Sequence, residues 1–420
     1  MDKRKETVYG MEVVAADRGK WQDADKRSTL PEAFGKKAAE AARAFHRQIP
    51  GYQVTPLVGL KGLADRLGVK GIYVKDESKR FSLNAFKGLG GSYAMFRILC
   101  QHLGLDPEVT TLKELLDERY REEIHQVVFV TATDGNHGRG VSWAGGLFGC
   151  QVHVYMPAGS VEVRAEAIRR VGPAQVTITD RNYDETVAYA MEQSQEHGWY
   201  LIQDTSWDGY EKIPSWIIQG YLTMASEALE QMEEAGETPT HVFLQAGVGA
   251  MAGGVLGYMV HCFDRRKPVV AVVEPAAANC IFLSVLEGDG KAHSVEGDPV
   301  TIMAGLNCGT PCRITWPVLR DYAEYFLSCP DYVAAHGMRL YARPENGDEA
   351  VVSGESGAAS MGALALVLEQ KELETVKESI GLKEDSVILL INTEGDTDPE
   401  GYRNVVEEGC FPVPGKSPQR

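Results

Sequence analysis

The stretch "VFLQAGVGAMAGGVLGYMV", residues 242–260, joins a short apolar run to a cluster of glycines and a longer apolar segment. This order predicts a buried strand that ends in a glycine loop and continues into a helix. The stretch is long enough to raise the question of a membrane span. Its five glycines and Gln245 favour the buried strand, loop and helix instead.

Short β-branched runs alternate with longer amphipathic segments on both sides of this stretch. The runs are apolar on both faces, as parallel strands covered by helices must be. The alternation predicts an α/β protein with parallel sheets flanked by helices. The predicted strands are residues 126–133, 151–157, 174–179, 200–203, 241–247, 268–275 and 386–393.

The composition restricts the class of protein. A length of 420 residues suggests two or three domains. The 59 acidic and 42 basic residues give a formal net charge of −17, which argues against sequence-independent binding to nucleic acid. The N-terminal segment has no apolar core of a secretory signal, so we expect a cytoplasmic protein without a membrane anchor.

The eight cysteines are spread along the chain, which is typical of a protein that keeps its thiols reduced. Their spacing contains no CxxC pair, and no His-x-x-x-His pair occurs, so we expect no zinc or other metal site. The sequence alone does not decide whether a specific pair, such as Cys280 and Cys308, is joined.

The carboxyl ends of the predicted strands are where ligands bind in open parallel sheets. This rule selects Asp134 to His137, Asp204, the glycines of residues 247–254, and Thr393. The glycines permit backbone N–H groups to approach an anion at a helix N-terminus. They would equally permit close packing of helix and sheet. Their spacing fits neither a P-loop nor a strict GxGxxG motif, so both interpretations remain open.

The segment "NAFKGLGGSYA", residues 84–94, places Lys87 beside Phe86 and immediately before glycines. A lysine on a helix usually extends its amine into water. An apolar pocket would instead lower the pKa of the amine and make it a nucleophile for an aldehyde. Pyridoxal 5′-phosphate carries both an aldehyde and a phosphate, so this one cofactor would explain Lys87 and the distant glycine loop together.

Several longer motifs strengthen this interpretation. The sequences "NAFKGLGG", "TDGNHGRG", "QAGVGAMAGG", "SGESGA" and "NTEGDTD" occur in the order found in fold-type-II pyridoxal-phosphate enzymes, which the chain resembles. The motifs "QDTSWDGYEKIPSWIIQGY" and "TIMAGL" are similar to those of the diaminopropionate ammonia-lyase subfamily. The resemblance extends from about Tyr52 to near the end of the chain.

The resemblance assigns roles to individual residues. Lys87 resembles the lysine that is linked covalently to the cofactor, and Asn136 the asparagine that contacts the cofactor's phenolic oxygen. Thr393 occupies the position of a Ser or Thr that faces the pyridine nitrogen, although its flanking residues differ and Glu355 is a second candidate for a place near the ring. The phosphate loop corresponds to Gly247, Val248, Gly249 and Ala250.

Asp134 departs from the wider family, where many dehydratases and racemases have a serine before Gly-Asn-His. A carboxylate accepts a proton directly and also pairs with an ammonium group, which suits a diamino acid substrate. The alternative is ordinary turn chemistry, since Asp is common before Gly-Asn. Asp204 either caps the next helix or, by resemblance, faces the side-chain amine of the substrate. We expect His137 to form structural hydrogen bonds.

The resemblance therefore implies a two-lobed enzyme that binds pyridoxal phosphate between its lobes and eliminates ammonia from 2,3-diaminopropionate. It implies catalysis by Lys87 and Asp134, a large domain of residues 1–91 and 205–420, a small domain of residues 92–204, and a homodimer. The expected partner is a small amino-acid substrate. The rival hypotheses are a serine or threonine dehydratase of the same fold and a non-catalytic metabolite-binding protein.

Overall fold

Two compact units make up the computed structural model, which describes residues 5–17, 30–297 and 299–415. Unit 1 comprises residues 1–31, 55–79 and 224–420, and unit 2 comprises residues 32–54 and 80–223. The boundaries of these compact units differ from the predicted domain boundaries at residues 91 and 204. The large and small domains around the ligand remain a prediction.

Unit 1 contains an eight-stranded sheet with the order β1-β2-β11-β10-β9-β12-β4-β3. Its five central strands, β11 to β4 in this order, run parallel, and β1, β2 and β3 pair antiparallel at the two edges. The strands are β1 (Lys5–Val8), β2 (Met11–Ala15), β3 (Leu57–Gly59), β4 (Gly71–Asp76), β9 (His241–Gln245), β10 (Val269–Pro275), β11 (Tyr325–Cys329) and β12 (Val387–Asn392).

Helices cover this sheet, and their apolar residues form the larger core. Strands β9 and β12 are buried at every residue, as expected for central parallel strands. The helices of unit 1 are α2 (Lys61–Leu67), α10 (Ala250–Phe263), α11 (Cys280–Glu287), α12 (Trp316–Tyr322), α13 (Asp331–Ala342), α14 (Glu355–Glu369), α15 (Glu374–Ile380) and α16 (Pro399–Val406). The long helix α9 (Lys212–Glu234) contributes residues to both units.

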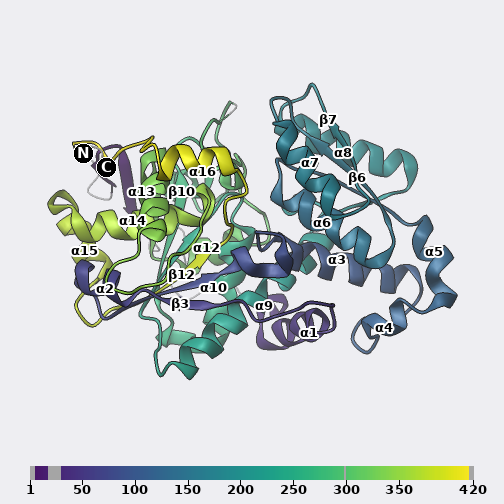
Figure 1. Ribbon diagram of the computed structural model, residues 1–420, viewed down its shortest axis with the longest axis horizontal. Helices are drawn as coiled ribbons and strands as arrows, with labels where there is room; N and C mark the ends of the chain where they lie inside the picture. The colour runs from purple at the N-terminus through teal and green to yellow at the C-terminus, as the bar shows by residue number, and fades with distance from the viewer. Residues whose placement is uncertain (1–4, 18–29, 298, 416–420) are drawn as a thin grey trace. The chain divides into compact units, whose positions relative to one another are not determined.

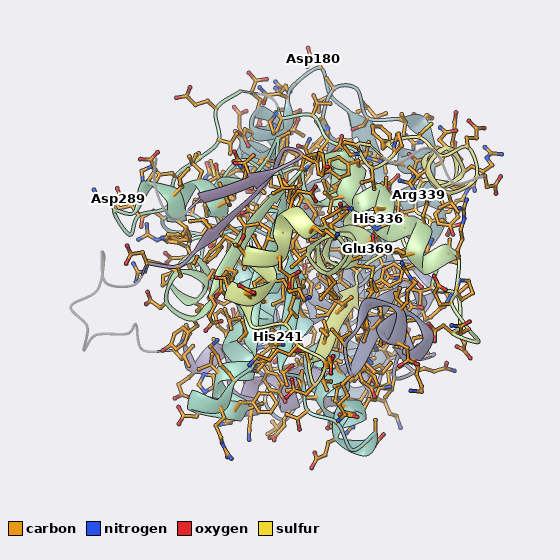
Figure 2. All side chains as sticks on the ribbon, turned by 90° about the vertical axis from the view of Figure 1, so that its left-hand side faces the viewer. Asp180, His241, Asp289, His336, Arg339 and Glu369 are labelled. Atoms are coloured by element: carbon orange, nitrogen blue, oxygen red, sulfur yellow. The ribbon has the colours of Figure 1, made fainter. Side chains whose placement is uncertain are left out.

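Polar groups with little exposure fix the elements of unit 1 to one another. His336 of α13 lies beside Glu369 at the end of α14, with 3.4 Å between His336 Nε2 and Glu369 Oε2 (Figure 2). Lys75 on β4 is fully buried, and its amine lies 2.8 Å from the equally buried carboxylate of Glu227 on α9. The same amine donates to the Thr55 carbonyl and the Gln231 side chain, at 2.7 and 2.8 Å. A charge buried this deeply requires such partners.

Unit 2 contains a four-stranded parallel sheet with the order β7-β6-β5-β8. Its helices α6, α7 and α8 lie around β6 and β7 in Figure 1. The strands are β5 (Val128–Ala132), β6 (Gln151–Met156), β7 (Gln175–Ile178) and β8 (Tyr200–Leu201); the helices are α1 (Lys36–His46), α3 (Lys87–His102), α4 (Leu112–Leu115), α5 (Arg121–Gln126), α6 (Asn136–Phe148), α7 (Glu162–Val171) and α8 (Tyr183–His197).

The predicted α/β class is confirmed, and each of the seven predicted strands contains an observed strand. The apolar segment at residues 242–260 forms β9, a loop and α10, as predicted. Among the described residues, no helix combines the length and the hydropathy that a membrane span requires.

Candidate active site

Lys87 is the first residue of α3, and its backbone is held by the close approach of α6. A Cβ atom at Gly140 of α6 would lie only 2.9 Å from the Lys87 carbonyl carbon and from the Gly88 nitrogen. Glycine at position 140 therefore permits the two helices to touch, and this contact fixes the point from which the lysine side chain extends.

The amine of Lys87 has both aromatic and charged neighbours. It is 5.1 Å from the centre of the Phe86 ring and 5.8 Å from that of Tyr221. It also forms an ion pair with the Asp204 carboxylate, and the exposed fractions of these two side chains are 19% and 13%. Sequence analysis predicted the apolar wall and selected Asp204 as a site residue, but it did not predict that Asp204 pairs with Lys87.

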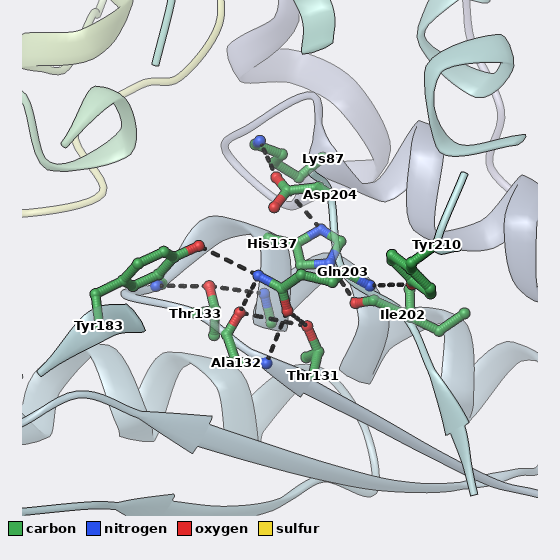
Figure 3. Close-up of polar contacts among 12 residues, drawn as sticks. Lys87, Thr131, Ala132, Thr133, His137, Tyr183, Ile202, Gln203, Asp204 and Tyr210 are labelled. Atoms are coloured by element: carbon green, nitrogen blue, oxygen red, sulfur yellow. Dashed lines mark hydrogen bonds and ion pairs between the residues drawn. The ribbon is translucent and has the colours of Figure 1, made fainter. Parts of the chain in front are cut away.

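Asp204 is positioned by its neighbour Gln203, whose buried side chain links the segment after β8 to strand β5 (Figure 3). The Gln203 amide donates to the Ala132 carbonyl and accepts from the Ala132 N–H, both at 3.1 Å. Its backbone N–H donates to the Tyr210 hydroxyl at 2.9 Å, and this hydroxyl donates to the Leu201 carbonyl. Sequence analysis did not identify Gln203, although a polar residue at the end of an apolar strand is the signal that could have done so.

His137 is buried on the first turn of α6. Its Nε2 atom donates to the Ile202 carbonyl at 2.8 Å, and its Nδ1 atom lies 3.8 Å from Asp204 Oδ2. Burial lowers the pKa of His137, and Lys87 lowers it further, although Asp204 acts in the opposite direction. An imidazole that donates to the backbone beside Asp204 fits the structural role expected for His137.

Asp134 and Asp204 lie close together but ionise differently. Burial, and to a smaller extent the nearby Asp204 carboxylate, raise the pKa of Asp134 to about 6 against the opposing effects of Arg164 and Lys87. Burial also acts to raise the pKa of Asp204, but His137 and Lys87 outweigh this effect and hold it well below its usual range. The site therefore contains one carboxylate whose pKa is lowered and one whose pKa is raised toward neutrality, a combination that is common at sites of acid–base chemistry. Asn136, the first residue of α6, is half-buried in the same turn.

The glycine loop lies in unit 1, between β9 and α10. Gly249 has φ +85°, and a Cβ atom there would lie 2.7 Å from Leu319 Cδ1 and 2.8 Å from Ile281 Cδ1, so only glycine fits. The Val248 carbonyl accepts from the Cys312 N–H at 2.7 Å. Ala250 begins α10, whose first backbone N–H groups have no acceptor within the helix. The loop therefore presents amides and the positive end of a helix dipole to an anion.

Thr393 follows β12 and forms a hydrogen bond with β9, the strand that leads into the glycine loop. Gln245, the last residue of β9, donates to the Thr393 hydroxyl at 3.0 Å and to the Ile391 carbonyl at 2.8 Å, and accepts from Ser360. Because the Thr393 oxygen accepts from this amide, its own proton points to another acceptor. Glu355 is buried at the first position of α14.

The predicted site residues thus form two groups. Lys87, Asp134, Asn136 and Asp204 come together in unit 2, and the glycine loop and Thr393 lie at the carboxyl edge of the sheet in unit 1. All eight cysteines lie in the described part of the chain, and none forms a disulfide, Cys280 and Cys308 included. The described residues contain no cluster of His, Cys, Asp or Glu that could hold a metal ion.

Comparisons with known proteins identify close relatives. The sequence profile described as "Pyridoxal-phosphate dependent enzyme" matches residues 49–393. The diaminopropionate ammonia-lyase of Escherichia coli (strain K12) is 50% identical over 383 residues, which are 90% of this chain and 94% of the relative. The holo structure of the diaminopropionate ammonia lyase from Escherichia coli has a TM-score of 0.88 at 47% identity, covering 96% of this chain and 98% of that one. A structure of the same enzyme in complex with an aminoacrylate-PLP azomethine reaction intermediate has a TM-score of 0.86 at 46% identity, covering 98% and 100%.

Proposed function

Since this chain belongs to the pyridoxal-phosphate dependent enzymes, and within them to the diaminopropionate ammonia-lyases, we propose that it eliminates ammonia from 2,3-diaminopropionate. The products are pyruvate and two molecules of ammonia, with one water consumed. The observation that carries this proposal is the cluster of Lys87, Asp134 and Asp204, which offers one amine and two carboxylates with unlike pKa values.

The fit to pyridoxal 5′-phosphate is supported by the residues themselves. The loop of Gly247, Val248, Gly249 and Ala250 has no space for a side chain at Gly249 and ends at a helix N-terminus, which suits the phosphate. Lys87 offers the amine that would hold the aldehyde. When bound, the cofactor supplies an electron sink for the bond that breaks.

We assign the remaining cofactor contacts to Asn136 and Thr393. Asn136 would contact the phenolic oxygen, and the Thr393 hydroxyl would face the pyridine nitrogen. The Thr393 assignment is supported by the Gln245 amide, which occupies one side of the hydroxyl oxygen and directs its proton elsewhere.

Proton transfer to and from the substrate is assigned by the chemistry of the cluster. The Lys87 amine removes the Cα proton of the L-isomer, and the Asp134 carboxylate removes that of the D-isomer from the opposite face. Asp204 stays charged and pairs with the side-chain ammonium group of the substrate. This ion pair takes the place of the ion pair between Asp204 and Lys87. We therefore expect activity on both isomers.

A pyruvate assay tests the proposal. The purified protein is given the cofactor and, separately, L- and D-diaminopropionate, L- and D-serine, and L-threonine. We expect diaminopropionate to give the highest kcat/KM, because serine and threonine lack the cation that Asp204 would pair with. A higher kcat/KM for serine or threonine would instead assign the chain to the dehydratases. Absence of pyruvate from every substrate would refute the proposed reaction.

We also propose that the enzyme is a cytoplasmic homodimer, with a large domain of residues 1–91 and 205–420 and a small domain of residues 92–204. The absence of disulfides among the eight cysteines supports a reducing compartment. Light scattering after size-exclusion chromatography measures the oligomeric state, and a monomeric mass of 46.0 kDa would contradict the dimer.

A further inference from the structure

Glu274 is a carboxyl group in the middle of an apolar environment. It lies near the end of β10, between Val273 and Pro275, and its exposed fraction is 0%. Burial raises its pKa to about 8, although contacts with backbone amides and Cys280 act to lower it.

The Glu274 carboxyl group holds the start of α11. Its Oε1 atom accepts from the Ile281 N–H at 2.9 Å, and its Oε2 atom accepts from the Phe282 N–H at 2.7 Å. These two amides belong to the first turn of α11, where the helix itself supplies no acceptor. Glu274 therefore fixes the position of α11 relative to the end of β10.

The first turn of α11 in turn contacts the glycine loop. The Cys280 Sγ atom lies 3.8 Å from the Gly247 carbonyl oxygen, to which it donates. The Ile281 side chain would be only 2.8 Å from a Cβ atom at Gly249, so it packs directly against the tightest point of the loop. A displacement of α11 would remove the support on this side of the loop.

We propose that Glu274 is a positioning residue that holds the loop Gly247–Gly249 in shape for the cofactor phosphate by fixing the first turn of α11. The proposal rests on the assignment of this loop to the phosphate. Glu274 does not contact the phosphate itself. It acts through Cys280 and Ile281, which touch the loop.

The variants Glu274→Gln and Glu274→Leu test this role. Glutamine keeps the volume and offers one acceptor in place of two, whereas leucine offers none. Asp348→Asn is the matched control, because Asp348 accepts from two consecutive amides, Gly62 and Leu63 at 2.8 and 2.9 Å, at the start of a different helix in the same unit.

The measurement is the dissociation constant of the cofactor-free protein for pyridoxal 5′-phosphate and, separately, for pyridoxal, which has the aldehyde but lacks the phosphate. We expect the constant for pyridoxal 5′-phosphate to rise about tenfold in Glu274→Gln and more in Glu274→Leu, as the loss of one or both buried hydrogen bonds implies. The constant for pyridoxal should change less than about twofold. Asp348→Asn should leave both constants as in the parent chain.

An equal loss of affinity for both compounds would show a general structural defect and overturn the proposal, as would unchanged affinity for pyridoxal 5′-phosphate in Glu274→Gln. If Glu274→Leu fails to fold, the glutamine variant still decides the question, and thermal unfolding of each cofactor-free variant reports its fold. Because no substrate is present, the result is independent of the proposed reaction, whose failure would appear only in the pyruvate assay of the parent chain.

Discussion

Replacing Asp134 by asparagine should separate the two enantiomers of diaminopropionate. Asparagine preserves the shape of the turn but cannot accept the Cα proton, and a positioned general base contributes about 10²- to 10⁴-fold to a rate. We therefore expect kcat/KM for the D-isomer to fall at least about a hundredfold. The L-isomer, which depends on Lys87, should lose less than about tenfold, because only the local charge changes.

The pH profile adds a second measurement to this prediction. Because burial raises the pKa of Asp134 to about 6, kcat/KM of the parent enzyme for the D-isomer should fall about tenfold per unit below that pH. Arg164 lowers the pKa of Asp134, so Arg164→Gln should move this acid limb to higher pH. Arg169→Gln on the same helix is the control, since Arg169 pairs with the exposed Glu162.

The assay records pyruvate release from each enantiomer between pH 5 and 9. Equal losses for both enantiomers in Asp134→Asn would refute the assignment of Asp134 to one face of the substrate. An acid limb in the D-isomer profile that does not move in Arg164→Gln, or that moves equally in Arg169→Gln, would refute the electrostatic argument.

Three further predictions concern single contacts. Lys87→Ala should abolish both the visible absorbance of the bound cofactor and turnover, and a coloured, active variant would contradict the role of this amine. Glu227→Ala should lower the free energy of unfolding by about 3–5 kcal/mol, because it leaves the Lys75 charge buried without its carboxylate. Denaturant titration measures the change, and a loss below about 1 kcal/mol would show that the ion pair contributes little to stability. Gln203→Leu should lower the free energy of unfolding by about 2 kcal/mol, because the Ala132 backbone groups lose their partners, and it should also lower kcat, because Asp204 loses its support. A normal kcat in a destabilised variant would show that Gln203 does not position Asp204 for catalysis.

The sequence was sufficient to predict the α/β class and the strands that are apolar on both faces, because burial on both sides leaves a clear pattern. The three edge strands of unit 1 and two of its parallel strands, β4 and β11, were not predicted. β1, β2 and β3 have three to five residues each, and β2 pairs antiparallel with β11, which lies far along the chain. Such pairing depends on tertiary contacts that a short window of sequence does not contain.

Prediction of the site from the sequence is limited in the same way. Lys87 was recognisable from Phe86 and the following glycines, but its carboxylate partner Asp204 follows it by more than a hundred positions. Lys75 reads as an ordinary surface lysine in "GIYVKDESK", and only the fold brings Glu227 beside it. Glu274 was visible as a charged residue in the apolar run "PVVAVVEP". Its function depends on the helix that the fold places next to it.

The antiparallel hairpin of β1 and β2 has a consequence for handling the protein. β2 pairs with β11 along residues 12–15 and therefore covers the outer edge of this last parallel strand of unit 1. A shortened chain that lacks this hairpin would present the unpaired N–H and C=O groups of β11 to neighbouring molecules, and such edges promote aggregation. Expression with a truncated N-terminal segment is therefore expected to give insoluble material even though no residue of the proposed catalytic cluster has been removed.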